Sequence, residues 1–255
     1  MSSRARTIFF LISAAGLAAV FAWGLRDAPP LGDYRGPYGN VVTQVAVYER
    51  HATDVVNAIN YDYRGFDTLG EEFIFFASVL GVLLLFRPQK GKEDQEKNDN
   101  KEQEQLEEEL PVSDTLRVSM QLMVVIMIVF GVYIAAHGQL TPGGGFQGGV
   151  ILASAPLVVY LSGNAETFER IVSSPLIKLA ESGGAAGYAI VGAAALFFGA
   201  HFLTNIIPLG MTGDLFSSGT IAVISALVGL EVTGGFVLLM KTYLQEIIVA
   251  HGGKK

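Results

Sequence analysis

The sequence predicts an all-α integral membrane protein with six transmembrane helices. Of its 255 residues, 51% are hydrophobic and 16% are charged, whereas soluble domains carry roughly a quarter charged residues. Long uncharged segments recur along the chain, each near the length that crosses a bilayer. The chain has no cysteine, which excludes disulfides, thiolate metal sites and a cysteine nucleophile on it. A net charge of −7 argues against a nucleic-acid partner.

The N-terminal part contains two expected spans. Residues 7–25 carry no charge and, at about 1.5 Å per residue, are just long enough to cross ~30 Å of hydrocarbon. A cleaved signal peptide is the alternative, but this apolar segment exceeds the ~7–15 residues of its hydrophobic region. Residues 26–67 are polar, and we expect a loop with one or two short amphipathic helices on the membrane surface or a partner. The apolar run 73–86 is too short to cross alone, so the second span must include residues 68–72.

A charged segment divides the chain. Residues 87–114 contain many acidic and basic side chains and almost no apolar ones, which is typical of a solvated linker. We therefore expect two modules, residues 1–88 with two spans and residues 115–255 with four, joined by a linker over 89–114. The four later spans are expected at 116–136, 148–161, 185–207 and 215–240, with an interfacial connection over 162–184.

The distribution of Lys and Arg predicts the orientation. If the N-terminus is cytoplasmic, the inner segments hold 13 of the 17 basic residues, as the positive-inside rule requires. Both termini and the charged linker are then cytoplasmic. The glycine-rich segment 137–149 faces outward.

That segment, His-Gly-Gln-Leu-Thr-Pro-Gly-Gly-Gly-Phe-Gln-Gly-Gly, formally contains a dinucleotide fingerprint. The fingerprint requires a preceding strand in a βαβ unit and a later acidic residue, so we reject it here. The glycines instead form small-x-x-x-small pairs that let a neighbouring helix approach closely. We predict a helix-packing motif, with direct contact to a moving ion as the alternative; its residues are Pro142, Gly143, Gly144, Gly145, Phe146, Gly148 and Gly149.

Glu231 is the most informative single residue, because it lies near the middle of the last expected span. An unpaired carboxylate there costs several kcal/mol, so it must be protonated, paired or in contact with water. We predict a role in ion or proton handling, the alternative being a protonated Glu that bonds between helices. His201 differs from Glu231 by about 15 Å in expected depth, so we expect it to bond between helices or line a water path. His137, at the outer end of the third span, is expected to be mainly structural.

Three further carboxylates, Asp67, Glu71 and Glu72, lie at the start of the second span. Thr68 and Glu71 match a capping box, which would explain Glu71 but neither Glu72, one residue deeper, nor Asp67, just outside. All three are ion-path candidates. The four histidines show no metal-ligand spacing, and no nucleophile lies in a recognisable catalytic context. We therefore expect no enzymatic activity, no cofactor and no metal site.

Two stretches resemble known proteins. Residues 116–240, with the motif His-Gly…Pro-Gly-Gly-Gly-Phe-x-Gly-Gly, resemble the MnhB/MrpB subunit of multisubunit Mrp-type cation/proton antiporters. Residues 41–87, with Asn-Ala-Ile at 57–59 and Asp-Tyr-Arg-Gly-Phe-Asp-Thr-Leu-Gly-Glu at 62–71, resemble the last stretch of the large MrpA subunit, which is the separate small subunit MbhE in membrane-bound hydrogenases. The chain thus resembles two neighbouring subunits fused through the charged linker.

The resemblance implies a multi-pass subunit of the inner (cytoplasmic) membrane that works with large antiporter-like subunits and small membrane subunits on sodium ions and protons. Glu71 matches the Gly-Glu of the MrpA-type stretch, and Glu231 stands where the MnhB family often has Asp. Two alternatives stay open. The same module can serve a membrane-bound hydrogenase-like redox complex, or the subunit can be purely structural.

Overall fold

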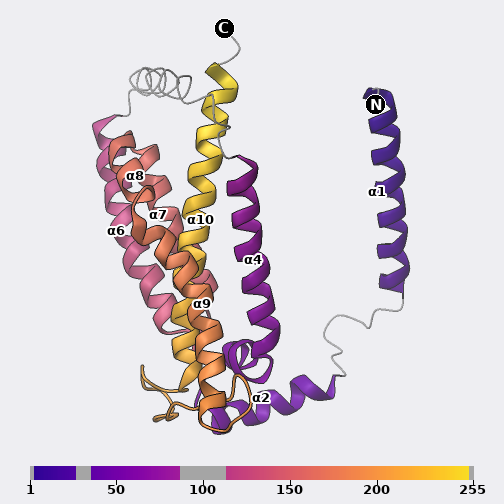
Figure 1. Cartoon of the computed structure of the whole chain (residues 1–255), viewed down its shortest axis with the longest axis vertical. Helices are drawn as coiled ribbons and strands as arrows, with labels where there is room; N and C mark the ends of the chain where they lie inside the picture. The colour runs from indigo at the N-terminus through magenta and orange to yellow at the C-terminus, as the bar shows by residue number, and fades with distance from the viewer. Residues whose placement is uncertain (1–2, 27–35, 87–112, 253–255) are drawn as a thin grey trace. The chain divides into compact units, whose positions relative to one another are not determined.

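The computed structural model describes residues 3–26, 36–86 and 113–252, and it contains only helices and their connections in these ranges (Figure 1). The expected all-helical class is therefore confirmed. Most of the expected linker 89–114, and the chain end at 253–255, lie outside the described residues. The helices are α1 (Ser3–Arg26), α2 (Pro37–Arg50), α3 (Val55–Ala58), the π-helix η1 (Ile59–Tyr63), α4 (Gly65–Leu85), α6 (Asp114–Ala136), α7 (Gly145–Leu161), α8 (Ala165–Val172), α9 (Pro175–Phe197) and α10 (Thr220–Gly252).

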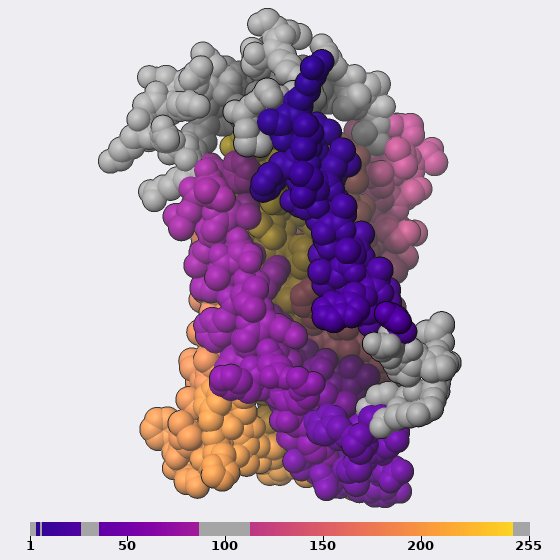
Figure 2. Space-filling model, turned by 90° about the vertical axis from the view of Figure 1, so that its right-hand side faces the viewer, coloured from indigo at the N-terminus to yellow at the C-terminus, as the bar shows by residue number. Residues whose placement is uncertain are grey.

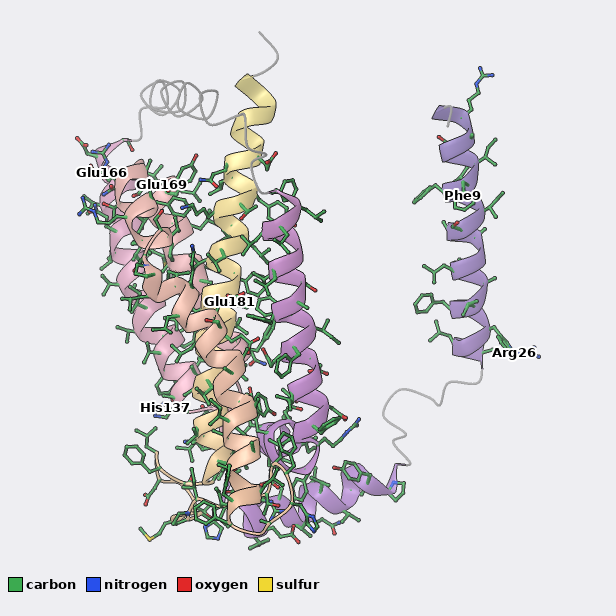
Figure 3. All side chains as sticks on the ribbon, in the orientation of Figure 1. Phe9, Arg26, His137, Glu166, Glu169 and Glu181 are labelled. Atoms are coloured by element: carbon green, nitrogen blue, oxygen red, sulfur yellow. The ribbon has the colours of Figure 1, made fainter. Side chains whose placement is uncertain are left out.

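The chain forms two compact units, residues 1–41 and 42–255. The first contains α1, whose apolar stretch Thr7–Arg26 is long enough to cross a membrane and has no buried residue within its unit. Its side chains, among them Phe9 and the terminal Arg26, point outward all round the helix (Figure 3). A helix that is apolar on every side is suited to lipid or to a partner helix.

Helix α10 forms the core of the second unit. It packs against α9, α7 and α4, and 61% of its apolar window is buried, against 6% for α6. Its buried face presents Ile221, Ile224, Val228 and Val232. Figure 2 shows α4 along one face of this unit, with the segment near residue 200 beside its first turns; there the rings of Phe66 and Phe202 lie 6.5 Å apart.

Among the described residues, five helices are long and apolar enough to span a membrane, and α7 is a shorter apolar helix of 17 residues. The expected short helices before the second span exist as α2, α3 and η1. The expected span 185–207 is wrong at both ends, since α9 covers Pro175–Phe197. Ser174 accepts a hydrogen bond from the Leu176 amide, and Pro175 takes the first helical position. This pairing starts a helix efficiently, so only residues 162–174 form the connection.

The last span also begins later than expected, at Thr220 instead of residue 215. Gly210, Gly213, Ser218 and Gly219 have positive φ angles, which a right-handed helix does not allow. The segment 198–219 therefore forms a long non-helical connection.

Close backbone contacts surround α10 and depend on glycine. A Cβ added at Gly145 would collide with the Ser225 carbonyl oxygen and lie 2.8 Å from the Gly229 nitrogen, both on α10. A Cβ at Gly148 would lie 2.6 Å from the Gly131 carbonyl oxygen of α6. The start of α7 thus fits between α6 and α10 because it has no side chains there.

This geometry predicts the effect of a single methyl group. Gly145→Ala should lower the stability of the purified protein by about 1–3 kcal/mol, because the backbone of α10 must move to accept the new atom. Thermal unfolding in detergent measures the change. Gly70→Ala in α4, where nothing lies within 4 Å of the added Cβ, is the control and should leave the unfolding temperature unchanged or slightly raised. Equal behaviour of the two variants would contradict the role of close packing at Gly145.

Candidate functional site

Three glutamates are buried where α4, α9 and α10 meet. The exposed fractions of Glu72, Glu181 and Glu231 are 5%, 4% and 0%. Neither carboxylate oxygen of Glu231 has a hydrogen-bond partner in the described part of the chain, and the same holds for Oε2 of Glu72 and Oε1 of Glu181. Buried polar atoms are nearly always satisfied, so this concentration of unsatisfied carboxylate oxygens makes the three glutamates the candidate site. We call these three residues the carboxylate row.

Helices α9 and α10 place two members of the row one turn apart. A Cβ at Gly184 of α9 would lie 2.6 Å from the Cβ of Glu231. A Cβ at Gly234 of α10 would lie 2.7 Å from the Cβ of Glu181. Each glutamate therefore lies against a glycine of the other helix, and Figure 3 shows Glu181 well inside the second unit rather than at an end of α9.

Helix α4 brings the third member. Phe75 packs against Gly235 of α10, where a Cβ would meet its ring at 2.6 Å, and Glu72 lies one turn earlier on α4. Glu231 interacts electrostatically with both Glu72 and Glu181. The three carboxylates thus gather around residues 231–235 of α10, with Glu181 approaching from α9 and Glu72 from α4.

The other two carboxylates expected in the second span lie outside the row. The side chain of Glu71 is exposed. Asp67 is half-exposed and accepts a hydrogen bond of 2.6 Å from Nε of Arg64, which also forms an ion pair with it. The capping-box interpretation of Thr68 and Glu71 is wrong, because α4 already begins at Gly65.

The two expected histidines lie away from the row. His201 follows the end of α9 in the non-helical connection and is exposed, so its expected position within the fifth span is wrong. His137 ends α6, where its Nδ1 lies 3.0 Å from the Tyr133 carbonyl oxygen and its ring stacks on Tyr133 at 4.2 Å between centroids.

Asn57 connects α3 to the glycine-rich segment. Its buried Nδ2 donates to the carbonyl oxygens of Gly138 at 2.5 Å and Gly143 at 3.1 Å, and to Oδ2 of Asp54 at 2.7 Å. Gly144 lies so close that a Cβ there would be 2.7 Å from Asn57 Oδ1. One amide group therefore holds the unwound backbone between α6 and α7 against the N-terminal half of the chain.

A second polar network lies around η1. Arg50 Nε donates to Oδ1 of Asp62 at 2.5 Å, and its guanidinium lies over the Tyr63 ring at 4.8 Å. Burial acts to lower the pKa of Arg50, but the hydrogen bond and charge of Asp62 outweigh it and raise the pKa above its ordinary value.

Asn205 Nδ2 donates to the Ser218 carbonyl oxygen at 2.9 Å, and its Oδ1 accepts from the Thr220 amide at 3.0 Å. Asn205 thereby caps the start of α10.

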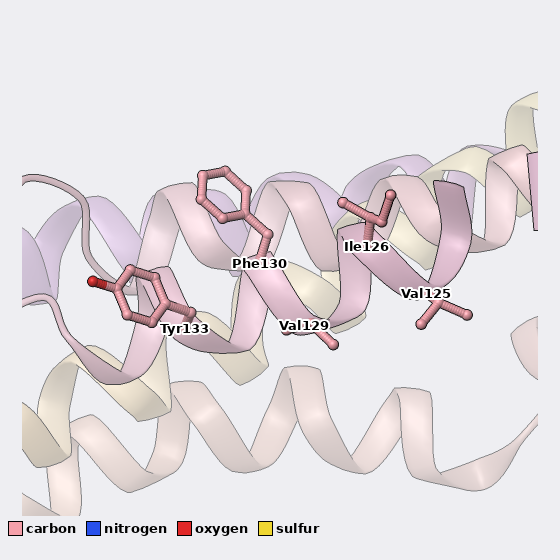
Figure 4. Close-up of a pocket in the computed structure, with 5 residues that line it drawn as sticks. All are labelled: Val125, Ile126, Val129, Phe130 and Tyr133. Carbon is pink, nitrogen blue, oxygen red and sulfur yellow. The ribbon is translucent and has the colours of Figure 1, made fainter. Parts of the chain in front are cut away.

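A hollow on α6 is of a different kind. It is lined only by Val125, Ile126, Val129, Phe130 and Tyr133 (Figure 4), most of which are exposed apolar side chains. Its lining contains no acidic side chain. This surface is suited to lipid or a neighbouring helix rather than to an ion.

The sequence pattern did not point to Glu181, because hydropathy predicts an interfacial connection over residues 162–184. The available signal was the Ser-Pro pair at 174–175, which starts α9 early enough to include Glu181. Asn57 stands out in the sequence only through a resemblance, since a single Asn in a polar segment predicts no particular partner.

Comparison with known proteins identifies the second half of the chain. Residues 115–238 match the model of a domain related to the MnhB subunit of Na+/H+ antiporter. This part of the chain belongs to the MnhB family. The expected resemblance over 116–240 is therefore confirmed, and this part of the chain contains helices long and apolar enough to cross a membrane.

Several relatives share this MnhB-type sequence. A protein of Methanocaldococcus jannaschii is 29% identical over 196 residues, which cover 71% of this chain and 72% of the relative. The probable K(+)/H(+) antiporter A/B subunit of Rhizobium meliloti is 29% identical over 79% of this chain but only 21% of its own length. The putative antiporter subunit mnhB2 of Staphylococcus aureus is 36% identical over 35% of this chain and 63% of its own.

Two solved structures share the fold of the MnhB-type chain. A chain of the membrane-bound sulfane sulfur reductase, an archaeal respiratory membrane complex, matches with a TM-score of 0.66 and 28% identity over 94% of this chain and 98% of that one. A chain of the Mrp complex from Dietzia sp. DQ12-45-1b matches with a TM-score of 0.66 and 22% identity over 95% of this chain and 26% of that one.

The Asn57 contacts predict a stability effect. Asn57→Ala should destabilise the folded protein by about 1–3 kcal/mol, because the carbonyl oxygens of Gly138 and Gly143 lose a buried donor. Thermal unfolding in detergent measures it. Asn60→Ala is the matched control, since Asn60 is exposed on the next turn and should change little. If the unfolding temperature of the control variant falls as far as that of Asn57→Ala, the connecting role of Asn57 is contradicted.

Proposed function

We propose that this subunit works in a multisubunit Mrp-type sodium(cation)/proton antiporter, where it supports assembly and its carboxylate row forms part of the ion pathway. The observation that carries the proposal is Glu231, which is fully buried with neither carboxylate oxygen bonded within the described ranges. An acidic side chain at the middle of a span costs about 2.5–3.5 kcal/mol on insertion scales. Exchange of a proton or a cation is the function that explains why such a costly residue is present.

The proposal includes six spans with both termini on the cytoplasmic side of the inner membrane. Helix α7 has 17 residues, or about 25 Å at 1.5 Å per residue, and it packs against both α6 and α10. The ends of α4 and α10 and the start of α6 lie at one end of the second unit. Most Lys and Arg residues of the sequence fall on that cytoplasmic side.

The proposal also includes a fused N-terminal module, residues 1–88, that corresponds to the C-terminal part of MrpA. The alignment with the Rhizobium A/B protein supports it, because 79% of this chain is more than the MnhB match at 115–238 can account for. The partners are then the large antiporter-like subunits and the small membrane subunits, with sodium ions and protons as cargo and lipid around the complex. The protein moves ions and catalyses no chemical reaction.

In this pathway the row carries charge along α10. Glu181 of α9 lies against Gly234, one turn from Glu231, and Glu72 of α4 lies one turn from Phe75, which packs on Gly235. Two like charges this close oppose each other's ionisation, so a proton or cation on one carboxylate favours release from the next. Cargo therefore moves stepwise instead of being held.

A second candidate function is a membrane module of a redox complex. One observation favours it: the chain matches 98% of the length of a chain in the sulfane sulfur reductase complex but only 26% of its counterpart in the Mrp complex. In such a complex the same carboxylate row would couple redox energy to an ion gradient.

Removal of the central charge tests the ion pathway. Glu231→Gln in the complete complex, reconstituted in vesicles, should lower sodium-driven proton movement by at least about tenfold, because the amide cannot exchange a proton. The control is Glu166→Gln on α8, whose side chain is 85% exposed and lies outside the row. Full exchange by assembled Glu231→Gln complexes would leave the purely structural alternative.

The subunit composition of the intact complex distinguishes the two candidate functions. Purification of the intact complex through a tag on this chain, followed by mass spectrometry, should yield large antiporter-like membrane subunits without metal-binding redox subunits. Stoichiometric recovery of subunits with redox metal centres would instead establish the second candidate.

A further inference from the structure

Helices α9 and α10 carry the same short motif where they contact each other. It is a glutamate followed three residues later by a glycine, Glu181 and Gly184 on α9 and Glu231 and Gly234 on α10. A Cβ at Gly184 would lie 2.6 Å from the Glu231 Cβ. A Cβ at Gly234 would lie 2.7 Å from the Glu181 Cβ. The contact is therefore reciprocal, and an approximate twofold axis between two antiparallel helices relates the glutamates.

This reciprocal contact brings the two glutamate side chains within reach of each other. Glu181 lies beside Gly234, which is three residues from Glu231 on α10. Three residues of an α-helix rise by about 4.5 Å, and residues at this spacing share one face. The glycines make the approach possible, because a Cβ at Gly184 would also lie 2.5 Å from the Leu227 carbonyl oxygen. Two glutamate side chains are long enough to close the remaining separation.

The pair is shielded from solvent and has no basic partner. Glu181 is 4% exposed and Glu231 is fully buried. Both Glu231 carboxylate oxygens and Oε1 of Glu181 lack a hydrogen-bond partner within the described ranges. The ion pairs found there join other residues, and the next basic side chain along α10, Lys241, pairs with Glu169 at 3.4 Å. None of these side chains therefore neutralises the two glutamates.

The other polar groups around the pair do not complete a larger site. The Thr233 hydroxyl on α10 donates to the Gly229 carbonyl oxygen at 2.6 Å. Helix α4 contributes Glu72, which is acidic as well and interacts electrostatically with Glu231. Among the described residues, no three acidic or histidine side chains come close enough to hold a metal ion together. The site at the helix contact thus consists of two carboxylates.

We propose that Glu181 and Glu231 form one binding site for a single monovalent cation, which a proton and a sodium ion occupy in turn. Two buried carboxylates this close oppose each other's ionisation, and a cation between them removes the conflict. A proton on one carboxyl group can be shared with the other by a hydrogen bond, which leaves one net negative charge. A sodium ion between two carboxylates leaves the same charge. Replacement of one ion by the other therefore leaves the charge of the buried site unchanged.

This inference rests on the proposed ion pathway, but its first test does not measure exchange. Dicyclohexylcarbodiimide modifies protonated carboxyl groups in apolar surroundings. In the intact complex it should modify Glu181 or Glu231, but not both in one chain, because the pair holds one proton. The masses of the chain and its peptides give the result. Sodium chloride should block the modification, whereas choline chloride at the same concentration should not.

Three results of this labelling would overturn the shared site. They are modification of both glutamates in one chain, modification of neither in the absence of sodium, and equal modification in sodium chloride and choline chloride. Glu181→Gln gives a further check that leaves the glycine contacts in place. Glu231 should still be modified in that variant, but sodium should no longer protect it. Unchanged protection by sodium would show that Glu231 binds the ion without Glu181.

A methyl group at the helix contact tests the spacing while both carboxylates stay in place. In assembled Gly184→Ala complexes, the sodium concentration that halves the modification should rise by about tenfold or more, as expected for a weakened charged contact. Gly183→Ala is the matched control, because only Leu179 Cδ1, at 4.0 Å, lies near its added Cβ. Equal protection of the two variants would contradict the proposed pairing.

Failure of the shared site and failure of the ion pathway give different results. If Glu231→Gln abolishes exchange but sodium does not protect the wild-type pair, the pathway stands and the shared site is wrong. If Glu231→Gln complexes keep full exchange, the pathway is wrong. Sodium protection of the wild-type pair would then still support a cation site, and its absence would overturn that site as well.

Discussion

Close backbone contact along α10 is the constraint on which the rest of the structure depends. Glycines of α7 and α9 bring their backbones against α10, and Gly234 and Gly235 of α10 accept α9 and α4 in turn. Without bulk water to drive association, membrane helices depend on such contacts. The tight fit also surrounds Glu231 with protein, which explains how a carboxylate in mid-span is fully buried.

The same packing joins the two halves of the sequence. Residues 42–85 belong to one compact unit with the MnhB domain. Asn57 donates a hydrogen bond to the glycine-rich segment. Asn205 bonds both to Asp62 and to the start of α10. The carboxylate row needs both halves, because Glu72 comes from one and Glu181 and Glu231 from the other. Because both parts belong to one chain, these groups occur in fixed proportion.

The sequence predicted the helical class, the position of Glu231 inside the last span and the small-residue character of residues 142–149, because apolar length, a charge within it and glycine spacing are local signals. It misplaced α9 by ten residues at each end, since hydropathy does not register that Ser174 and Pro175 start the helix. That error hid Glu181 and placed His201 in a span. It also did not separate Glu71 from Glu72, because only the rotation of α4 about its axis decides which of two adjacent residues is buried.

Access of water to the row is what the proposed pathway requires most directly. The chain has no native cysteine, so Glu181→Cys, introduced in the intact complex, provides the only thiol on this chain. A membrane-impermeant, positively charged methanethiosulfonate reagent should label this thiol, with the mass of the chain as the measure and sodium slowing the reaction. Ile74→Cys, an exposed apolar position of α4, should stay unlabelled as a lipid-facing control. If the thiol introduced in place of Glu181 is as inert as the control, the carboxylate row lies in no aqueous path and the proposed pathway is contradicted.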